Sequence, residues 1–137
     1  MVRRIIEKTL DRYLRSYIDL SSCQRGFIPL PGTHINSTII NGCLQSSKHE
    51  HKDCCIFFLD VTKAYDNIGH THLKRCLSQT DLPTNLRDLI IDLIEGNTIQ
   101  IETGLNKSKN ITLQKGVAQG SPFSPILFNL VINEILK

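Results

Sequence analysis

Residues 56–66 read IFFLDVTKAYD, an apolar run that ends in one aspartate and is followed by a second. The four branched and aromatic residues predict a short buried strand, and they place Asp60 where that strand leaves the core. A carboxylate in such a place is stable only when a cation meets it. A divalent ion such as Mg²⁺ would suit it, because hard cations take carboxylate oxygen and leave positions open for phosphate. The alternative is a turn aspartate that accepts hydrogen bonds from backbone amides, and Asp60 taken alone favours that alternative.

A glycine-punctuated polar loop follows near the end of the chain, where residues 116–129 read GVAQGSPFSPILFN. Gly116 and Gly120 would let another molecule approach the backbone closely. Ser124 followed by Pro125 predicts the start of a helix, with serine as the N-cap and proline in the first turn. The loop lacks the lysine of a phosphate-cradling nucleotide loop, which excludes that motif.

Three segments of the chain resemble motifs of reverse transcriptases, in the order that this family shows. Residues 57–70, FFLDVTKAYDNIGH, resemble motif A, and residues 116–136, GVAQGSPFSPILFNLVINEIL, resemble motif B. Residues 23–38, CQRGFIPLPGTHINST, resemble the fingers motif that precedes motif A. The wording is most similar to the non-LTR retrotransposons, in particular the R2 group, and the resemblance covers nearly the whole chain.

The resemblance implies a role for each matching position. Asp60 would be the first of three carboxylates that hold two Mg²⁺ ions, with the Val61 backbone carbonyl beside it. Tyr65 would screen the sugar 2′ position and so favour deoxynucleotides, with plain core packing as the alternative. The positions implied to contact the incoming nucleotide or the template are Lys63, Ala64, Gln119 and Gly120. Of these, Lys63 could equally be a solvated loop charge.

Two departures from the family pattern lie in motif B, where related sequences commonly carry lysine at the position of Ala118 and aspartate at that of Ser121. Losing a cation there would weaken binding without removing the metal chemistry, because phosphate contacts mainly supply affinity. The larger departure is the absence of an adjacent pair of aspartates, which the family places in a hairpin after motif B. We therefore expect an internal piece of a polymerase that carries one third of the metal site and is inactive alone.

Other carboxylates do not replace the missing pair, because they are scattered along predicted loops and helix faces. They are Asp53, Asp81, Asp88, Asp92 and Glu95. The first hypothesis is thus a fragment of an RNA-directed DNA polymerase, whose partners would be an RNA template, a DNA primer, deoxynucleoside triphosphates and the rest of the retroelement polyprotein. The alternative is a non-catalytic nucleic-acid-binding or interaction protein derived from a truncated element copy.

Composition is compatible with both hypotheses. The 137 residues carry a net charge of +3, which permits nucleic-acid binding without demonstrating it. Five cysteines, with no signal peptide and no membrane-spanning run, predict a reduced protein in the nucleus or cytoplasm. A group of histidines and cysteines follows no standard zinc spacing, so we expect no zinc there: His49, His51, Cys54 and Cys55.

The predicted fold class is α+β, the fingers and palm portion of a right-hand polymerase with helices against a small antiparallel sheet. Domain 1–137 would divide into a fingers-like part, about 1–50, and a palm part, about 51–137, with motif C absent. Hydrophobic periodicity predicts helices over about 2–18, 35–48, 70–79 and 84–95. Alternating residues 99–103 and 111–113 predict a hairpin. The first helix is basic and could lie along a template backbone, although a solvated face is the simpler interpretation.

Overall fold

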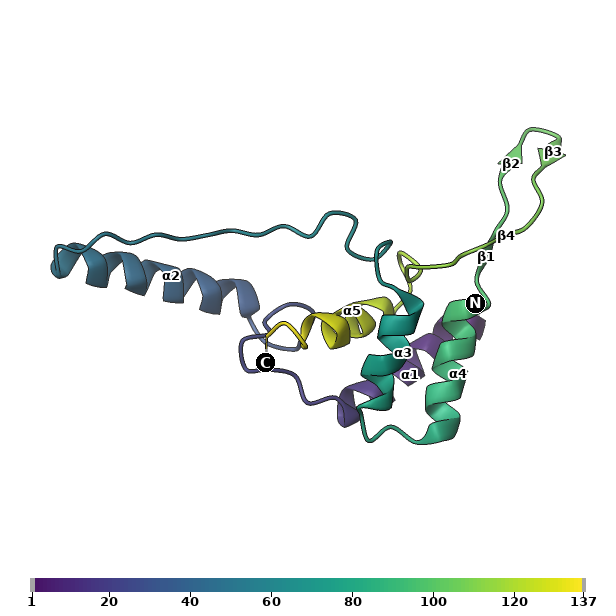
Figure 1. Cartoon of the computed structure of the whole chain (residues 1–137), viewed down its shortest axis with the longest axis horizontal. Coiled ribbons are helices and arrows are strands. Elements are labelled where there is room, and N and C mark those ends of the chain that lie inside the picture. Colours follow the sequence, from purple (N-terminus) through teal and green to yellow (C-terminus); the bar gives the residue numbers. More distant parts are fainter. Residues whose placement is uncertain (1, 137) are drawn as a thin grey trace.

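Helices dominate the computed structural model, which describes residues 2–136 (Figure 1). The helices are α1 (Val2–Tyr17), α2 (Gly32–His49), α3 (His70–Ser78), α4 (Thr84–Glu95) and α5 (Ser124–Ile132). The strands have two residues each: β1 (Thr98–Ile99), β2 (Glu102–Thr103), β3 (Asn106–Lys107) and β4 (Ile111–Thr112). Helices with small antiparallel sheets confirm the α+β class, and all the predicted helices form.

Four helices share one hydrophobic core. Helix α3 packs against both α4 and α5, and α1 packs against α5. The core is built by apolar residues at helical spacing and by a few loop residues: Leu10, Leu14, Ile68, Leu73, Cys76, Leu77, Leu82, Ile90, Ile94, Val117, Phe123, Ile126, Leu127 and Leu130. Leu10 and Leu14 lie one turn apart on α1 and are buried in this core, whereas Val2, Ile5 and Tyr13 on the same helix stay exposed. The first helix therefore belongs to the same core as the segment around the predicted site.

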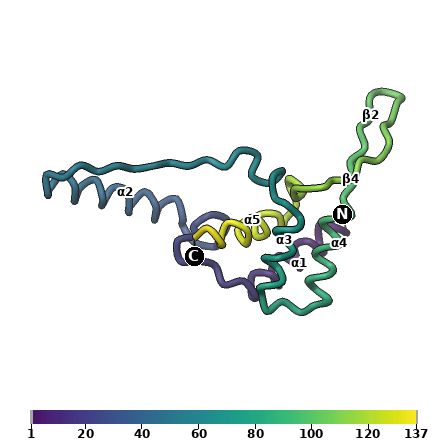
Figure 2. Tube along the Cα trace, viewed as in Figure 1, coloured from purple at the N-terminus to yellow at the C-terminus, as the bar shows by residue number. Residues whose placement is uncertain are grey.

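Helix α2 stands apart from that core as an arm, and the hairpin projects on the other side of the helical body (Figure 2). Among its described residues, α2 buries only Gly32 at its first position. Its last turn carries Lys48 and His49, where positive charge suits the negative end of the helix dipole. The arm forms as a helix, as predicted, but contributes little to the packing.

The predicted hairpin is confirmed as two short antiparallel pairings in succession. Strand β1 pairs with β4, with Thr98 opposite Thr112, and β2 pairs with β3, with Thr103 opposite Asn106. At the tip, Gly104 adopts a φ of +59°, a conformation that costs a glycine little. Its strands are exposed on both faces.

The buried strand predicted for residues 56–59 is wrong. Phe57, Phe58 and Leu59 are 87%, 80% and 95% exposed, and residues 53–61 run as an irregular extended segment. A strand needs hydrogen-bonding partners on a neighbouring strand, and none of the described residues 2–136 supplies them. The apolar run therefore stays exposed, without a strand partner among residues 2–136.

None of the helices in residues 2–136 combines the length and the apolar character that crossing a membrane requires.

Candidate functional site

The turn that follows Asp60 packs against the loop before α5. We call this contact the junction; it joins residues 62–70 to residues 115–121. The Gly116 amide donates to the Ile68 carbonyl at 2.7 Å, and the Val117 amide donates to the Tyr65 carbonyl at 3.0 Å. The two segments that resemble motifs A and B, about 50 residues apart in sequence, are thus held by their backbones.

Gly116 makes this close approach possible. Its φ is +89°, and a Cβ there would lie 3.1 Å from backbone atoms of Asp66 and 3.2 Å from the Tyr65 carbonyl oxygen. The buried side chain of His70, at the start of α3, places Nε2 2.8 Å from the Gly116 carbonyl oxygen. Because a carbonyl oxygen only accepts, the His70 ring donates this hydrogen bond. Glycine at 116 is therefore required by both backbone conformation and space. Gly120 also has a positive φ, +81°, but faces open space.

Polar side chains close the junction at its rim. Gln119 Nε2 donates to Asp66 Oδ1 at 3.0 Å, and Lys115 Nζ donates to Asn67 Oδ1 at 3.0 Å. Asn67 in turn donates to the Thr62 carbonyl at 2.9 Å. Asp66 accepts its hydrogen bond from the opposite segment, which sequence spacing could not reveal.

Tyr65 lies half-buried between two aromatic rings. Its ring centroid is 6.4 Å from that of Phe27 and 5.6 Å from that of Phe128, both in tilted arrangements. Burial raises the pKa of the Tyr65 phenol above its ordinary value, so the hydroxyl is neutral at pH 7. The Tyr65 side chain is therefore packed between two rings and still partly exposed.

The predicted metal ligands lie outside the junction. Asp60 and Val61 sit on the exposed segment, and Asp60 makes no side-chain hydrogen bond or ion pair with the other residues in 2–136. Lys63 turns the chain with a φ of +49°, and its carbonyl accepts from the Asn67 amide at 3.0 Å. Ala64 is half-buried beside Tyr65. The structure thus joins the Tyr65 turn to the Gln119–Gly120 loop. Asp60 lies outside this contact, and its side chain forms no hydrogen bond or ion pair within residues 2–136.

Two hollows flank the Ala118–Gln119 backbone. One, of about 690 Å³, lies between Asp66, the base of the hairpin and residues 115–119. The other, of about 320 Å³, is lined by Arg3 and Arg4 of α1 together with Gln119 and Gly120. The basic end of α1 therefore faces the loop in which alanine stands at position 118.

Helix α5 carries polar residues that sequence reasoning missed. Asn129 in α5 and Asn133 at its C-cap are 0% and 3% exposed and lie one turn apart. Asn129 binds Gln24 and Gly26 at the start of the predicted fingers motif, and Asn133 binds Ser21 and Asp19 in the segment before it. Two asparagines at that spacing, on a stripe otherwise made of leucine and isoleucine, are the signal that could have found them.

The predicted N-cap at Ser124 is wrong. Helix α5 begins at Ser124 itself, and the Ser124 hydroxyl donates to the Ala118 carbonyl at 2.7 Å. The preceding loop folds back over the first turn, so the hydroxyl meets a carbonyl acceptor there. Ser121 likewise donates to buried Glu7 at 2.9 Å, which ties the loop to α1.

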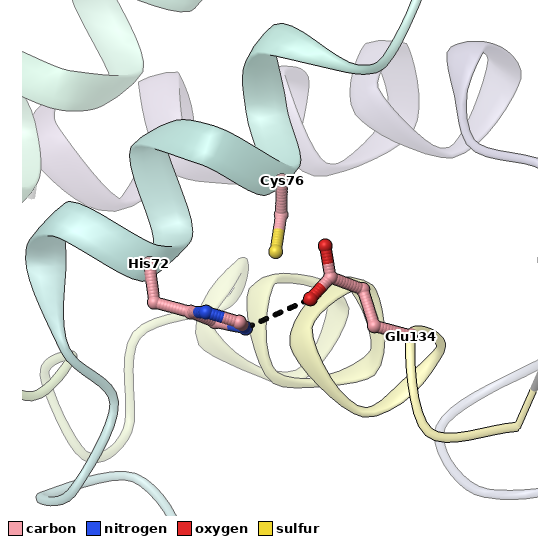
Figure 3. A group of neighbouring side chains, drawn as sticks. All are labelled: His72, Cys76 and Glu134. Carbon is pink, nitrogen blue, oxygen red and sulfur yellow. Dashed lines mark ion pairs between the residues drawn. The ribbon is translucent and has the colours of Figure 1, made fainter.

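His72, Cys76 and Glu134 form a cluster of possible metal ligands between α3 and the end of α5 (Figure 3). His72 Nε2 lies 3.2 Å from Glu134 and forms an ion pair with it only when the imidazole is protonated, and Arg75 lies 2.9 Å from the same oxygen and 3.1 Å from His72 Nδ1. Burial, reinforced by the negative charge of Glu134, raises the pKa of the Cys76 thiol to about 11. Desolvation raises the pKa of Glu134, but hydrogen bonds from Arg75 and Cys76 and the nearby charges of Arg75 and His72 outweigh it, so that this pKa is lowered. Arg75 already supplies the cation, so we read the cluster as an interhelical polar contact.

Comparisons with known proteins show which family the chain belongs to. A family model described as "Reverse transcriptase (RNA-dependent DNA polymerase)" matches residues 1–137. The chain is 34% identical over 134 residues to the "Retrovirus-related Pol polyprotein from type-2 retrotransposable element R2DM" of Drosophila melanogaster. It is 29% identical over 136 residues to the "Retrovirus-related Pol polyprotein from type-1 retrotransposable element R2" of Popillia japonica.

The same alignments cover 98% of this chain but only 13% of the Drosophila protein and 19% of the Popillia protein. A "Reverse transcriptase-like protein" of Chlamydomonas reinhardtii is 25% identical over 134 residues, which are 34% of its length. The chain therefore spans well under two thirds of each of these relatives.

Proposed function

This chain belongs to the reverse transcriptase family, and from that premise we propose that it forms the nucleotide-facing part of an R2-like RNA-directed DNA polymerase. The observation that carries the proposal is the junction, where the Tyr65 turn and the Gln119–Gly120 loop are held together by backbone hydrogen bonds. In this proposal residues 1–50 correspond to fingers and residues 51–137 to palm. The polymerase works inside the cell on an RNA template and a DNA primer.

Reverse transcriptases use divalent metal ions, and we propose Mg²⁺ as the ion here. Asp60 and the Val61 carbonyl offer hard oxygen donors on an exposed segment, which fits such an ion. When bound, the metal would lower the pKa of the primer hydroxyl and offset charge on the triphosphate. Among the described residues no second carboxylate completes a set around Asp60, so the remaining ligands would come from elsewhere in a polymerase.

The residues of the junction position the nucleotide rather than react with it. Tyr65 presents a neutral phenol on a ring fixed by its aromatic neighbours, and we propose that this ring excludes a ribose 2′-hydroxyl. Gln119 is oriented by Asp66, and Gly120 leaves open space in front of its backbone. A substrate sugar or base could therefore approach this loop without displacing a side chain.

Phosphate binding is assigned to cations at the edge of the same loop. Arg3 and Arg4 line the hollow beside Gln119 and Gly120, and Lys63 lies on the exposed turn before Tyr65. Arg3 is partly neutralised by Glu7 at 2.8 Å, which leaves Arg4 as the freer charge. A cation from α1 would thus stand near the position where alanine replaces the lysine common in related motif B sequences.

The experiment is primer extension by a chimera in which residues 1–137 replace the matching 134 residues of the Drosophila R2DM polyprotein. We expect RNA-templated incorporation of deoxynucleotides by the chimera, and none by the isolated chain. In the chimera, Tyr65→Val should raise ribonucleotide incorporation by at least about tenfold, because a small side chain leaves room for the 2′-hydroxyl. A folded chimera that binds template and primer without extending them would contradict the proposal and favour a non-catalytic binding role.

A further inference from the structure

Asn129 is a buried side chain with every polar atom committed. Its Oδ1 accepts from Gln24 Nε2 at 2.5 Å, and its Nδ2 donates to the Gly26 carbonyl at 2.8 Å. These two contacts cross more than 100 residues of sequence. A buried amide that satisfies both ends in this way fixes the segment it binds, because releasing that segment would leave donors and acceptors without partners.

The segment held by Asn129 is the turn that presents Phe27. Phe27 adopts a φ of +55°, which is rare for a residue with a side chain, and more than half of it is exposed. Two polar residues hold the backbone on either side of that conformation. Asn129 binds the Gly26 carbonyl, and Arg15 Nη1 of α1 donates to the Phe27 carbonyl at 2.9 Å. Such a conformation persists only where its surroundings impose it.

Both rings that flank Tyr65 therefore depend on one part of α5. Phe128 is the neighbour of Asn129 in the helix and contacts Tyr65 directly, whereas Phe27 reaches Tyr65 through the turn that Asn129 holds. Tyr65 itself is tied to the junction by its carbonyl, which accepts from the Val117 amide. With its backbone fixed, the remaining freedom of Tyr65 lies in its ring, and the ring is bounded by these two phenylalanines.

We propose that Asn129 is a positioning residue that sets the ring of Tyr65 through Phe27, and thereby controls discrimination between deoxyribo- and ribonucleotides. The claim that Asn129 controls nucleotide discrimination rests on the proposed function of Tyr65. The claim that Asn129 positions the Tyr65 ring rests on the contacts described above. Asn129 touches neither Tyr65 nor any substrate-facing residue of the junction by a hydrogen bond, so its influence passes through the fingers-like turn.

Asn133, the C-cap of the same helix, provides a matched control. It is an equally buried asparagine one turn further on, and it also binds two backbone groups, the Ser21 amide at 2.7 Å and the Asp19 carbonyl at 3.0 Å. Those groups lie before the Phe27 turn, and Asn133 belongs to no aromatic contact of Tyr65. Replacing either asparagine should lower the free energy of unfolding by a similar amount, but only the replacement of Asn129 should loosen the Tyr65 ring.

The first test isolates the Tyr65 ring in the chain itself. The sequence has no tryptophan and three tyrosines, so Tyr13→Phe with Tyr17→Phe leaves Tyr65 as the sole fluorophore when excitation is at wavelengths that phenylalanine does not absorb. In this background we expect Asn129→Ala to raise iodide quenching of Tyr65 about twofold, because the ring loses a neighbour on one face. Asn133→Ala should leave quenching unchanged. Gln24→Ala removes one hydrogen-bond partner of Asn129 without creating a cavity in the core, and it should also raise iodide quenching of Tyr65. This second variant keeps the test decisive if Asn129→Ala does not fold.

The second test measures nucleotide selectivity in the chimera. Asn129→Ala and Gln24→Ala should reduce the preference for deoxynucleotides about tenfold, mainly through a lower KM for ribonucleotides, and Asn133→Ala should not. Unchanged quenching in both Asn129→Ala and Gln24→Ala would overturn the positioning. Unchanged selectivity in these variants, while Tyr65→Val loses it, would overturn the control of selectivity. If Tyr65→Val itself kept full selectivity, the proposed role of Tyr65 would fail instead.

Discussion

Gly116 shows how one residue determines the geometry of the junction. It has the backbone conformation that glycine tolerates best, and its missing Cβ leaves the space through which the Asp66 and Tyr65 backbones approach. His70 then anchors its carbonyl from the core side. A side chain at position 116 would have to strain its own backbone and separate the two segments at once.

We predict that Gly116→Ala lowers the free energy of unfolding by about 2–4 kcal/mol, since it combines an unfavourable φ with a backbone clash. Gly104→Ala is the control, because Gly104 also has a positive φ but faces open space. That variant should cost only about 1 kcal/mol. Urea denaturation of both variants measures the difference, and equal losses would contradict the close approach at Gly116.

Cys76 allows a second prediction at the scale of one residue. Four cysteines are exposed, whereas Cys76 is buried with a thiol pKa of about 11, raised by burial and by Glu134. The thiolate is the reactive form, so at pH 8 Cys76 should react with a disulfide reagent at least about a hundredfold more slowly than the others. Counting thiols with and without denaturant checks this. Five equally fast thiols would mean that α3 and α5 are not packed as described.

For single residues, the sequence did not predict contacts between side chains that lie far apart along the chain. Glycine at 116 and the aromatic at 65 were identifiable, because their chemistry is intrinsic or matches a motif. The partners of Asp66 and Asn129 lie 53 and more than 100 residues away, and no local pattern encodes them.

Among the elements, the helices were predictable and the motif A strand was not. A helix satisfies its hydrogen bonds within itself, so the periodicity of α1 or α4 suffices to predict it. A strand satisfies them with a partner, and the segment 53–61 has none among the described residues. Its apolar side chains therefore remain exposed.

This leads to a prediction for the exposed segment. Leu59→Ser should change the free energy of unfolding of the isolated chain by no more than about 0.5 kcal/mol, because the side chain makes no buried contacts. Leu77→Ser, at a fully buried position of α3, should cost about 3 kcal/mol or more. Chemical denaturation compares the two. If Leu59→Ser lowered the free energy of unfolding as much as Leu77→Ser, residues 56–59 would be buried as a strand, contrary to the structure.

The whole molecule combines a packed helical body with two projecting parts, the α2 arm and the hairpin (Figure 1). The body holds the junction, whereas the candidate metal ligand lies on the strand-like segment outside it. The chain spans 13% and 19% of the lengths of two R2 polyproteins. Membership of the family follows from the comparisons, and the catalytic assignment rests on Asp60.

Asp60 is tested most directly by single-nucleotide incorporation on an RNA template with the chimera saturated in Mg²⁺. Asp60→Asn keeps the size of the side chain and removes its charge, so we predict a rate at least about a thousandfold lower, about 4 kcal/mol of activation free energy. Asp53→Asn makes the same change on the same exposed segment and should leave the rate unchanged. An Asp60→Asn chimera that incorporates nucleotide as fast as the Asp53→Asn chimera would contradict the assignment of Asp60 as a metal ligand.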